Sequence, residues 1–343
     1  MTDITLLKRG AIGHITLRRP QALNAVTYEM CIGIEGALTA WAGDTDVKMV
    51  VIDAEGDKAF SAGGDLQAMW DTGRAGQFEY GRRFWRDEYR LNAMIYNFPK
   101  PYAAFMQGFT MGGGVGVSCH GSHRVVCETS QIAMPECGVG LVPDVGGSLL
   151  LARAPGHLGE YLGTTGARMG PGDAIYAGFA DYYVPRAAWP DLIERLSQTG
   201  DWDEIDRAAQ PAPEAQIAKN QALVDRHFAG ASARDIVNGF DGSEFCTLAE
   251  GMMRKAAPLS VSATVDLVRR VRAFEAIEPA LEMEYRFTAR AAEHGDFLEG
   301  IRAAVIDKDR QPNWRHTRLE DVSALDVSRM LMPLGKDRLN LDS

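Results

Sequence analysis

Short strand-like runs, each followed by a glycine-rich corner or a helical pattern, recur through the first half of the chain. Ile4 to Lys8 and Ile12 to Leu17 open the sequence, and the apolar run Val47 to Ile52 is typical of a strand covered on both faces. Pro99 to Met106 and Arg124 to Glu128 are further strand-like runs. To about residue 185 the order is strand, strand, helix, repeated. This order predicts an α/β fold of successive ββα turns, not the alternation of a doubly wound sheet.

Helical patterns separate these strand-like runs. Thr27 is suited to cap a helix that continues through Leu38, because its hydroxyl can accept from the free N–H groups of a first turn. A short helix is expected from Asp65, and a long one over Phe78 to Phe98. These helices complete the repeated ββα order.

The composition changes beyond residue 185, where alanine, glutamate, arginine and leucine dominate and strand-like runs end. Val261 to Phe274 and Ile277 to Ala292 carry apolar residues at helical spacing, and Gln210 to Pro213 is typical of a linker. We therefore expect two parts. Residues 1–190 would form a core of ββα turns, and residues 191–343 a helical region that packs on it.

The overall composition is that of an ordinary globular chain. Of the 343 residues, 46% are hydrophobic and 24% are charged, which excludes an intrinsically disordered protein and a disulfide-stabilised mini-protein. The formal net charge of −10 argues against a nucleic-acid-binding protein, because affinity for polyanions depends on clustered lysine and arginine. A small anionic substrate needs only a local basic patch and is compatible with this charge.

Targeting signals and disulfide bonds are not expected. The opening residues MTDITLLKRG have neither the apolar segment of a signal peptide nor the pattern of an amphipathic leader. No apolar run approaches the roughly 18 residues of a membrane-spanning helix. We expect a cytoplasmic protein with no membrane or nucleic-acid partner, whose cysteines are reduced and buried. The five cysteines are scattered and include no CxxC pair: Cys31, Cys119, Cys127, Cys137 and Cys246.

Two glycine-rich corners are the most informative features of the core: SAGGDL, Ser61 to Leu66, and MGGGVG, Met111 to Gly116. Glycine lets the backbone approach a ligand closely, and an N–H group at a helix N-terminus is directed at developing negative charge. Two such N–H groups from separate corners would make an oxyanion hole, although a structural role is the commoner use of such corners. The second corner lacks the GxGxxG order and no GxxxxGK[ST] motif occurs, which argues against NAD and ATP.

The segment MPECGVGLVPDVGGS, Met134 to Ser148, places two carboxylates in apolar surroundings. These are Glu136 and Asp144, in a stretch stiffened by glycine and proline. Burying charge among such residues is costly, which makes both side chains candidate acid–base groups. A capping role is the alternative, with Asp144 at the start of a helix near Gly146. The residues alone leave both interpretations open.

Other polar patterns receive ordinary interpretations. His120 and His123 form an HxxH motif without an acidic or cysteine partner at ligand spacing, so no metal site is expected. No serine stands in a GxSxG motif, which argues against a nucleophile-elbow hydrolase. The arginines of the long helix could meet phosphates, but a solvent-exposed ionic face is favoured. The charged residues expected on that face are Arg82, Arg83, Arg86, Arg90, Glu79, Asp87 and Glu88.

Taken together, these motifs resemble the crotonase, or enoyl-CoA hydratase/isomerase, superfamily. AFSAGGDL, MGGGVG, MPE and PDVGG occur in that family's order, at matching spacing, over residues 1 to about 185. A closer likeness, to a hydrolase branch of the superfamily, covers nearly the whole chain. It includes FWRDEYRLN around Glu88, MGGGVGVSCHG, AMPECGVGLVPDVGGS, MEYRFTAR and HGDFLEGIRAAVIDKDRQPNW. Each motif alone is unspecific, whereas the combination is highly specific.

The resemblance implies a crotonase-like spiral of ββα turns, with a C-terminal helical region, that binds a coenzyme A thioester. It places the oxyanion-hole N–H groups at Gly64 and Gly113, which would hold the thioester oxygen. It makes Glu136 and Asp144 the catalytic carboxylates and Glu88 a substrate-contacting carboxylate. Coenzyme A would be part of the substrate, so no separate cofactor is expected. A homo-oligomer of three or six copies is also implied.

The same resemblance favours hydrolysis over hydration. Hydratases carry a first catalytic glutamate just after the glycine cluster, where this chain has Gly116, and a second at the position of Glu136. A single glutamate cannot hold water in the two-carboxylate clamp of alkene hydration, and Asp144 stands where hydratases usually have glycine.

The implied reaction is hydrolysis of a short branched 3-hydroxyacyl-CoA thioester, most closely 3-hydroxyisobutyryl-CoA, as in valine breakdown. Glu136 would act either as the nucleophile or as a general base. An enoyl-CoA hydratase or isomerase is the first alternative. A non-catalytic protein that binds acyl-CoA is the second.

Overall fold

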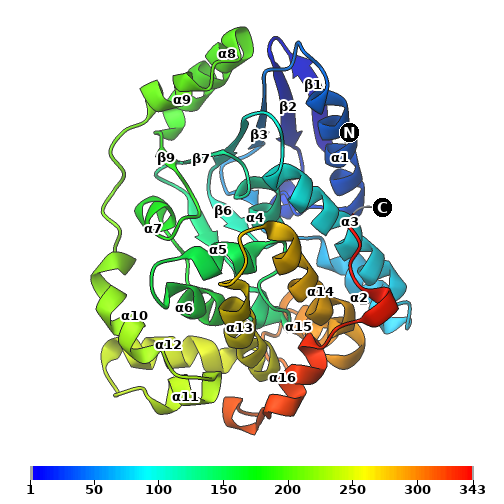
Figure 1. Ribbon diagram of the computed structural model, residues 1–343, viewed down its shortest axis with the longest axis vertical. Helices are drawn as coiled ribbons and strands as arrows, with labels where there is room; N and C mark the ends of the chain where they lie inside the picture. The colour runs from blue at the N-terminus through cyan, green and yellow to red at the C-terminus, as the bar shows by residue number, and fades with distance from the viewer. Residues whose placement is uncertain (1–2, 342–343) are drawn as a thin grey trace. The chain divides into compact units, whose positions relative to one another are not determined.

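The computed structural model describes residues 3–341, which form two β-sheets and sixteen α-helices (Figure 1). The strands are β1 (Ile4–Arg9), β2 (Ile12–Leu17), β3 (Met49–Ala54), β4 (Ala59–Ser61), β5 (Tyr102–Met106), β6 (Phe109–Met111), β7 (His123–Val126), β8 (Gln131–Ala133) and β9 (Tyr182–Tyr183). The helices up to β9 are α1 (Tyr28–Ala42), α2 (Leu66–Arg74), α3 (Glu79–Tyr96), α4 (Gly113–Ser118), α5 (Gly147–Arg153), α6 (Leu158–Thr165) and α7 (Pro171–Tyr176). The later helices are α8 (Trp189–Thr199), α9 (Asp203–Ala208), α10 (Gln221–His227), α11 (Ala233–Asn238), α12 (Glu244–Lys255), α13 (Pro258–Val271), α14 (Ile277–His294), α15 (Phe297–Ile301) and α16 (Ala324–Leu331).

The larger sheet has six strands in the order β1-β2-β3-β5-β7-β9. Strands β1 and β2 form an antiparallel hairpin, and the strands from β2 to β9 run parallel to one another. The hairpin turns at Gly10, whose φ is +58° and whose added Cβ would come within 2.1 Å of the Ser197 carbonyl oxygen. Only glycine fits such a corner. The central strand β5 is buried along its whole length, as its continuous apolar run predicts.

The smaller sheet consists of three parallel strands of three residues each, in the order β4-β6-β8. The register pairs Ser61 of β4 with Thr110 of β6, and Met111 of β6 with Ala133 of β8. Because neighbouring parallel strands end at the same edge of a sheet, the segments that follow β4, β6 and β8 leave from that one edge. Two of these segments are the glycine-rich corners, and the third leads within three residues to Glu136.

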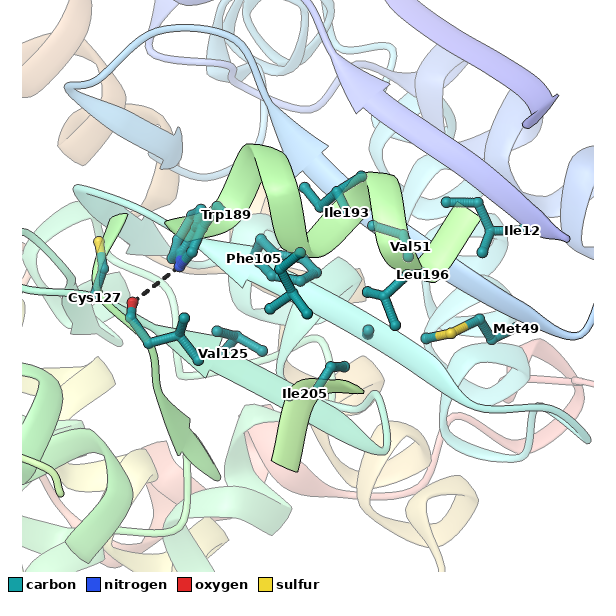
Figure 2. Close-up of a cluster of buried hydrophobic side chains, with 13 residues drawn as sticks. Ile12, Met49, Val51, Phe105, Val125, Cys127, Trp189, Ile193, Leu196 and Ile205 are labelled. Atoms are coloured by element: carbon teal, nitrogen blue, oxygen red, sulfur yellow. Dashed lines mark hydrogen bonds between the residues drawn. The ribbon is translucent and has the colours of Figure 1, made fainter. Parts of the chain in front are cut away.

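One hydrophobic core lies between the larger sheet and helix α8. In Figure 2, Trp189, Ile193 and Leu196 of α8 point toward sheet side chains that include Phe105. The Trp189 and Phe105 rings meet edge to face with their centroids 5.2 Å apart. The indole N–H of Trp189 also donates to the Val184 carbonyl oxygen at 2.9 Å, so its polar atom is satisfied inside the core.

A second core lies among helices of the C-terminal half. It contains Phe228, Val237, Met253 and Val265, and also Cys137 from the short 3₁₀ helix Glu136–Val139. The apolar faces of α11, α12 and α13 supply most of this core, as expected for amphipathic helices.

The described chain divides into two compact units that interleave along the sequence. One holds residues 1–64, 90–133 and 168–218, and includes both sheets. The other holds residues 65–89, 134–167 and 219–343. From α8 onward the described chain adds only helices and 3₁₀ or π turns as regular elements, matching the change in composition. The proposed division into residues 1–190 and 191–343 stays a prediction.

The expected local structure is largely confirmed. Thr27 caps α1 by accepting from the Met30 N–H group at 3.2 Å, and Asp65 caps α2. The long predicted helix is α3. The five cysteines are buried, and none of them forms a disulfide bond within the described residues. The short strands β4, β6 and β8 were not among the predicted runs, since three residues carry too little periodicity to be recognised.

We predict that Trp189→Ala destabilises the protein by about 3–5 kcal/mol, because it leaves a cavity in the core and removes the hydrogen bond from the indole N–H to Val184. Trp202→Ala is the matched control, since Trp202 is 41% exposed and should cost less than about 1 kcal/mol. Thermal and denaturant unfolding followed by far-ultraviolet circular dichroism will measure both. Equal losses in the two variants would contradict this description of the core.

Candidate active site

Three of the carboxyl groups singled out in the sequence lie buried within one compact unit. Glu88 is on α3, Glu136 begins the 3₁₀ helix after β8, and Asp144 lies in the loop before α5. Their exposed fractions are 3%, 6% and 4%. Burial raises the pKa of both Glu88 and Glu136, and the negative charge of Asp144 raises both further, so the three groups are electrostatic neighbours.

Asp144 is held by the phenol of Tyr89, the residue that follows Glu88 on α3. The Tyr89 hydroxyl donates to Asp144 Oδ2 at 2.8 Å, and its oxygen lies 3.3 Å from the Thr288 hydroxyl. Burial raises the pKa of Asp144 to about 7, although the hydrogen bond from Tyr89 opposes the rise. The carboxyl therefore changes charge near neutral pH.

The alternative role of Asp144 as a helix cap is wrong. Helix α5 begins at Gly147, and its N-cap residue is Gly146, which has no side chain to cap the helix. Asp144 contributes only its backbone carbonyl, which accepts from the Gly147 N–H group at 2.7 Å. Its carboxylate is thus free of a capping role and is directed to Tyr89.

Glu136 has a carboxylate oxygen, Oε2, that is buried without a hydrogen-bond partner among the described residues. Burial raises its pKa well above the ordinary range, and the charges of Asp144 and Glu284 raise it further. A buried acceptor without a partner is costly, so such an atom usually has a function. Here the free oxygen could take a proton or attack an electrophilic carbon.

Glu88 does not share the solvent-exposed ionic face that was predicted for α3. Its side chain is buried, and burial raises its pKa well above the ordinary value, with a further contribution from Asp144. The arginines of that helix do form ion pairs: Arg82 with Glu293, Arg86 with Glu79, and Arg90 with Glu35. The prediction therefore holds for the ionic face and fails for Glu88, which lies on the inward side.

Sequence reasoning missed a fourth carboxyl group, that of Glu284 on α14. It is fully buried, and its carboxylate accepts from the N–H groups of Gly146 at 2.8 Å and Ser148 at 3.0 Å, and from the Ser148 hydroxyl. Burial raises the pKa of Glu284 to about 8, against these hydrogen bonds and with a contribution from Asp144. Glu284 belongs to the MEYRFTAR motif, but its spacing along an amphipathic helix resembles that of an ordinary core position.

The turn that Glu284 holds contains an uncommon backbone conformation. Val145 has a φ of +54°, in the left-handed region that β-branched residues rarely adopt, and Gly146 follows at +79°. Such strain persists only where surrounding contacts enforce it, and it collects at functional sites. The hydrogen bonds from Gly146 and Ser148 to Glu284 supply those contacts directly beside Asp144.

The two glycine-rich corners lie side by side at the edge of the smaller sheet. A Cβ added to Gly114 would approach the Ser61 carbonyl oxygen to 2.5 Å, and one added to Gly63 would lie 3.6 Å from the Met111 carbonyl oxygen. Gly113 is the first residue of α4, where an N–H group has no acceptor within the helix. A Cβ on Gly64 would meet open space. The two corners thus lie together, and the assignment of the Gly64 and Gly113 N–H groups to an oxyanion hole stays a prediction.

Metal-ligand geometry is found elsewhere in the chain. Within residues 3–341, one group of ligand-type side chains, His227, Asp241 and Cys246, has donor atoms within 4.8 Å of one another, and the buried carboxyls are not part of it. His120 and His123 are buried, and their rings contact those of Tyr96 and Tyr182, respectively.

None of the helices in the described range is both long and apolar enough to cross a lipid bilayer.

Comparisons with known proteins were made for the whole chain. A family model described as Enoyl-CoA hydratase/isomerase matches residues 12–331. The chain is 37% identical to the protein named 3-hydroxyisobutyryl-CoA hydrolase, mitochondrial, of Gallus gallus, over 99% of this chain and 91% of that protein.

Two solved structures are similar over their full length. One, described as an enoyl-CoA hydratase from Rhodobacter sphaeroides 2.4.1, is 51% identical with a TM-score of 0.94, covering 99% of this chain and 100% of that chain. The other, described as a carnitinyl-CoA dehydratase from Mycobacterium thermoresistibile, is 36% identical with a TM-score of 0.95, covering 100% of both chains. These matches confirm the predicted crotonase-like fold.

We predict that Glu284 makes stability depend on pH in a definite direction. Its pKa is raised from 4.5 to about 8 by folding, so between these values the folded state holds a proton that the unfolded state has lost. The stabilisation is complete below the lower pKa and is lost as pH rises through the upper one, with a limiting slope of about 1.4 kcal/mol per pH unit.

Denaturant unfolding of the wild type and of Glu284→Gln between pH 5 and 9 will measure that slope. The Glu284→Gln variant should be less stable than the wild type at pH 5, because an amide cannot accept all the hydrogen bonds from Gly146 and Ser148. Its free energy of unfolding should fall less steeply, so the difference between the two proteins should narrow toward pH 9. Parallel curves for the two proteins would show that Glu284 does not hold the proton.

Proposed function

The chain belongs to the enoyl-CoA hydratase/isomerase family, and on that premise we propose that it hydrolyses a short branched 3-hydroxyacyl-CoA thioester. The preferred substrate would be 3-hydroxyisobutyryl-CoA, and the products 3-hydroxyisobutyrate and free coenzyme A. The name of the Gallus gallus relative supports this substrate. The observation that carries the proposal is the buried pair Glu136 and Asp144, in which one carboxylate oxygen has no partner and the other group titrates near neutral pH.

The glycine corners would stabilise the charge that develops on the thioester oxygen. Attack on a thioester carbonyl moves an electron pair onto that oxygen, and the N–H groups of Gly64 and Gly113 would donate to it. Removing one such donor typically costs on the order of 3 kcal/mol of barrier. The tight packing of Gly114 against Ser61 supports this role, because rigid donors need no reorganisation during the reaction.

Glu136 would act on the carbonyl carbon in one of two ways. As a nucleophile, its free oxygen bonds to the acyl carbon, the C–S bond breaks with its electron pair on sulfur, and water then cleaves the mixed anhydride. As a general base, it takes a proton from a water molecule whose oxygen attacks the same carbon directly. Both routes need the deprotonated form of Glu136, so its raised pKa makes it a stronger base but reduces the fraction that is active.

Asp144 is suited to carry the proton that the reaction moves. A thiol has an ordinary pKa of about 8.5, so the departing thiolate needs only modest acid assistance. A carboxyl group with a pKa of about 7 can donate that proton and take it up again near neutral pH. Tyr89 fixes the direction of the carboxyl through its hydrogen bond.

Glu88 would contact the acyl group of the substrate. Burial raises its pKa and so favours the protonated form, which can donate one hydrogen bond and accept another. A 3-hydroxyl group offers a matching donor and acceptor. This pairing supports selection of hydroxyacyl over simple acyl thioesters.

A second candidate function, hydration of an enoyl-CoA or the reverse, is favoured by the description of the Rhodobacter sphaeroides structure as an enoyl-CoA hydratase. Against it stands Gly116, buried in the short helix α4, where the family resemblance places the first glutamate of a hydratase. Without that carboxylate, the water molecule would be held by Glu136 alone instead of by two carboxylates. We therefore rank hydrolysis first.

The two functions are separated by supplying 3-hydroxyisobutyryl-CoA and crotonyl-CoA in parallel. Free thiol is measured with a chromogenic disulfide, and loss of the enoyl chromophore is followed in the ultraviolet. Thiol release from the hydroxyacyl substrate, with no change in the enoyl chromophore, is the expected result. Loss of the enoyl chromophore without release of free thiol would support the hydratase. No change in either assay would support a non-catalytic acyl-CoA-binding protein.

We predict that Glu136→Gln lowers kcat by at least about 100-fold while leaving thioester affinity nearly unchanged, because the amide keeps the shape of the side chain but is neither base nor nucleophile. Asp144→Asn should lower kcat less and remove the pH dependence near neutrality. The exposed residue Glu275 provides the matched control Glu275→Gln, which should have normal kinetics. Near-normal turnover by Glu136→Gln would show that the reaction proceeds without this carboxylate.

A further inference from the structure

A histidine, an aspartate and a cysteine meet in the helical part of the C-terminal half. His227 is the last residue of α10, Asp241 lies in the turn before α12, and Cys246 is in the first turn of α12. One donor atom from each lies within 4.8 Å of the donors of the other two. We propose that these three side chains form a zinc-binding site, which is independent of the proposed hydrolase reaction.

The hydrogen bonding of His227 leaves its second ring nitrogen free to bind a metal ion. Nδ1 lies 3.2 Å from the carbonyl oxygen of Gly239, and because a carbonyl can only accept, Nδ1 carries the proton. In the neutral ring the lone pair is then on Nε2. That atom is buried and has no hydrogen-bond partner among the described residues. A backbone carbonyl that fixes the tautomer in this way is the usual support of a metal-binding histidine.

Asp241 presents one oxygen to the turn and the other to the histidine. Oδ1 accepts from the Ser243 N–H group at 3.1 Å, and Oδ2 lies 3.4 Å from His227 Nε2. Two ligands about 2.1 Å from a tetrahedral zinc ion are separated by about 3.4 Å, so the histidine and aspartate already have the spacing of a metal site. An ordinary neutral hydrogen bond would be shorter.

Cys246 adds the ligand that makes zinc the preferred ion. Thiolate and imidazole together favour zinc over magnesium or calcium, which prefer oxygen. Cys246 is fully buried, whereas the Asp241 side chain is 39% exposed, so the cluster opens to solvent on the aspartate side. A water molecule entering there would complete four-fold coordination. When zinc binds, the cysteine S–H bond gives its proton to solvent and its sulfur electron pair to the metal.

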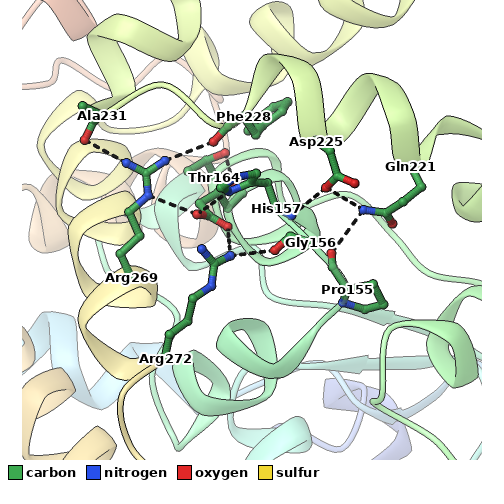
Figure 3. Close-up of polar contacts among 11 residues, drawn as sticks. Pro155, Gly156, His157, Thr164, Gln221, Asp225, Phe228, Ala231, Arg269 and Arg272 are labelled. Carbon is green, nitrogen blue, oxygen red and sulfur yellow. Dashed lines mark hydrogen bonds and ion pairs between the residues drawn. The ribbon is translucent and has the colours of Figure 1, made fainter.

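The surrounding contacts hold His227 rigidly in place. On one side, Asp225 accepts from the His157 N–H group at 2.9 Å and from Gln221 at 2.8 Å. On the other side, Arg269 donates to the Phe228 carbonyl oxygen at 3.1 Å (Figure 3). Residues on both sides of His227 are thus fixed by polar contacts, so the ligand does not need to be ordered when the ion binds.

This site is not recognisable from the sequence, because its ligands follow no known metal-binding spacing. Asp241 lies 14 positions after His227, and Cys246 lies five positions after Asp241, which matches neither a CxxC nor an HxxH motif. Folding α10 back toward the start of α12 brings the three together. A bound ion would link α10 to α12 across the turn, and would act as a structural clamp rather than in the chemistry.

The proposal is tested on the full-length protein after treatment with a chelator. The protein is titrated with Zn²⁺, and bound zinc is counted by mass spectrometry of the desalted sample. In parallel, Co²⁺ is added as a spectroscopic substitute for zinc. We expect one zinc ion per chain, a rise in Tm on adding Zn²⁺, and a thiolate-to-cobalt charge-transfer band in the ultraviolet.

Variants test whether the bound zinc and the cobalt charge-transfer band belong to His227, Asp241 and Cys246. Cys246→Ser should lose the charge-transfer band, whereas Cys31→Ser, which removes a buried cysteine of α1, should keep it. Asp241→Asn retains the acceptor for Ser243 and lies at the surface, so it should fold normally and bind zinc at least tenfold more weakly. Absence of bound zinc in the wild type, or a cobalt band that survives in Cys246→Ser, would overturn the proposal. If Cys246→Ser does not fold, equal zinc affinities of Asp241→Asn and the wild type would overturn it as well.

Discussion

The removal of several carboxyl groups from water, within reach of one another's charge, is the constraint on which the rest of the structure depends. Glu88, Glu136, Asp144 and Glu284 are each buried, and within residues 3–341 none of them forms an ion pair with an arginine or a lysine. Desolvation penalises their charged forms, and each negative charge makes the next one harder to form. Burial therefore raises the pKa of all four groups, to about 7 for Asp144 and about 8 for Glu284, and raised pKa values of this kind suit acid–base chemistry.

Two of the four carboxyls, those of Asp144 and Glu284, are held by hydrogen-bond donors within their own compact unit. The smaller sheet ends in two glycine corners and in the segment that carries Glu136, so three short parallel strands determine where these segments begin. Tyr89 on α3 holds the Asp144 carboxyl, and Glu284 on α14 holds the strained turn that follows it. The larger sheet and its core with α8 provide stability without entering the chemistry. Glu160 shows a different arrangement, in which a fully buried carboxylate forms ion pairs with the half-buried Arg269 and Arg272.

Much of the fold and part of the candidate site could be predicted from the sequence. The elements and residues that the predictions missed have physical reasons for being missed. Long apolar runs and clear caps predicted β2, α1 and α3, and the apolar setting of Glu136 and Asp144 marked them as candidate acid–base groups. Glu284 could not be found in this way, because its partners Gly146 and Ser148 lie more than 130 positions away and only packing brings them together. Glu88 is expected on the exposed face of α3 because its neighbours in the sequence are charged. Its spacing from the buried Phe84 and Leu91, four and three positions, nevertheless places it on the apolar side of the helix. His227, Asp241 and Cys246 are likewise joined by the fold and not by spacing.

The most direct test of the central claim is infrared spectroscopy of the carboxyl groups. A protonated carboxyl has a C=O stretching band that the carboxylate lacks, so the band reports how many groups hold a proton at a given pH. The wild type should show this band at pH 6 and lose part of it between pH 6 and 9, with smaller bands in Asp144→Asn and in Glu284→Gln. A wild-type protein without the band at pH 6, whose carboxyls all titrate near their ordinary values of about 4, would contradict the account.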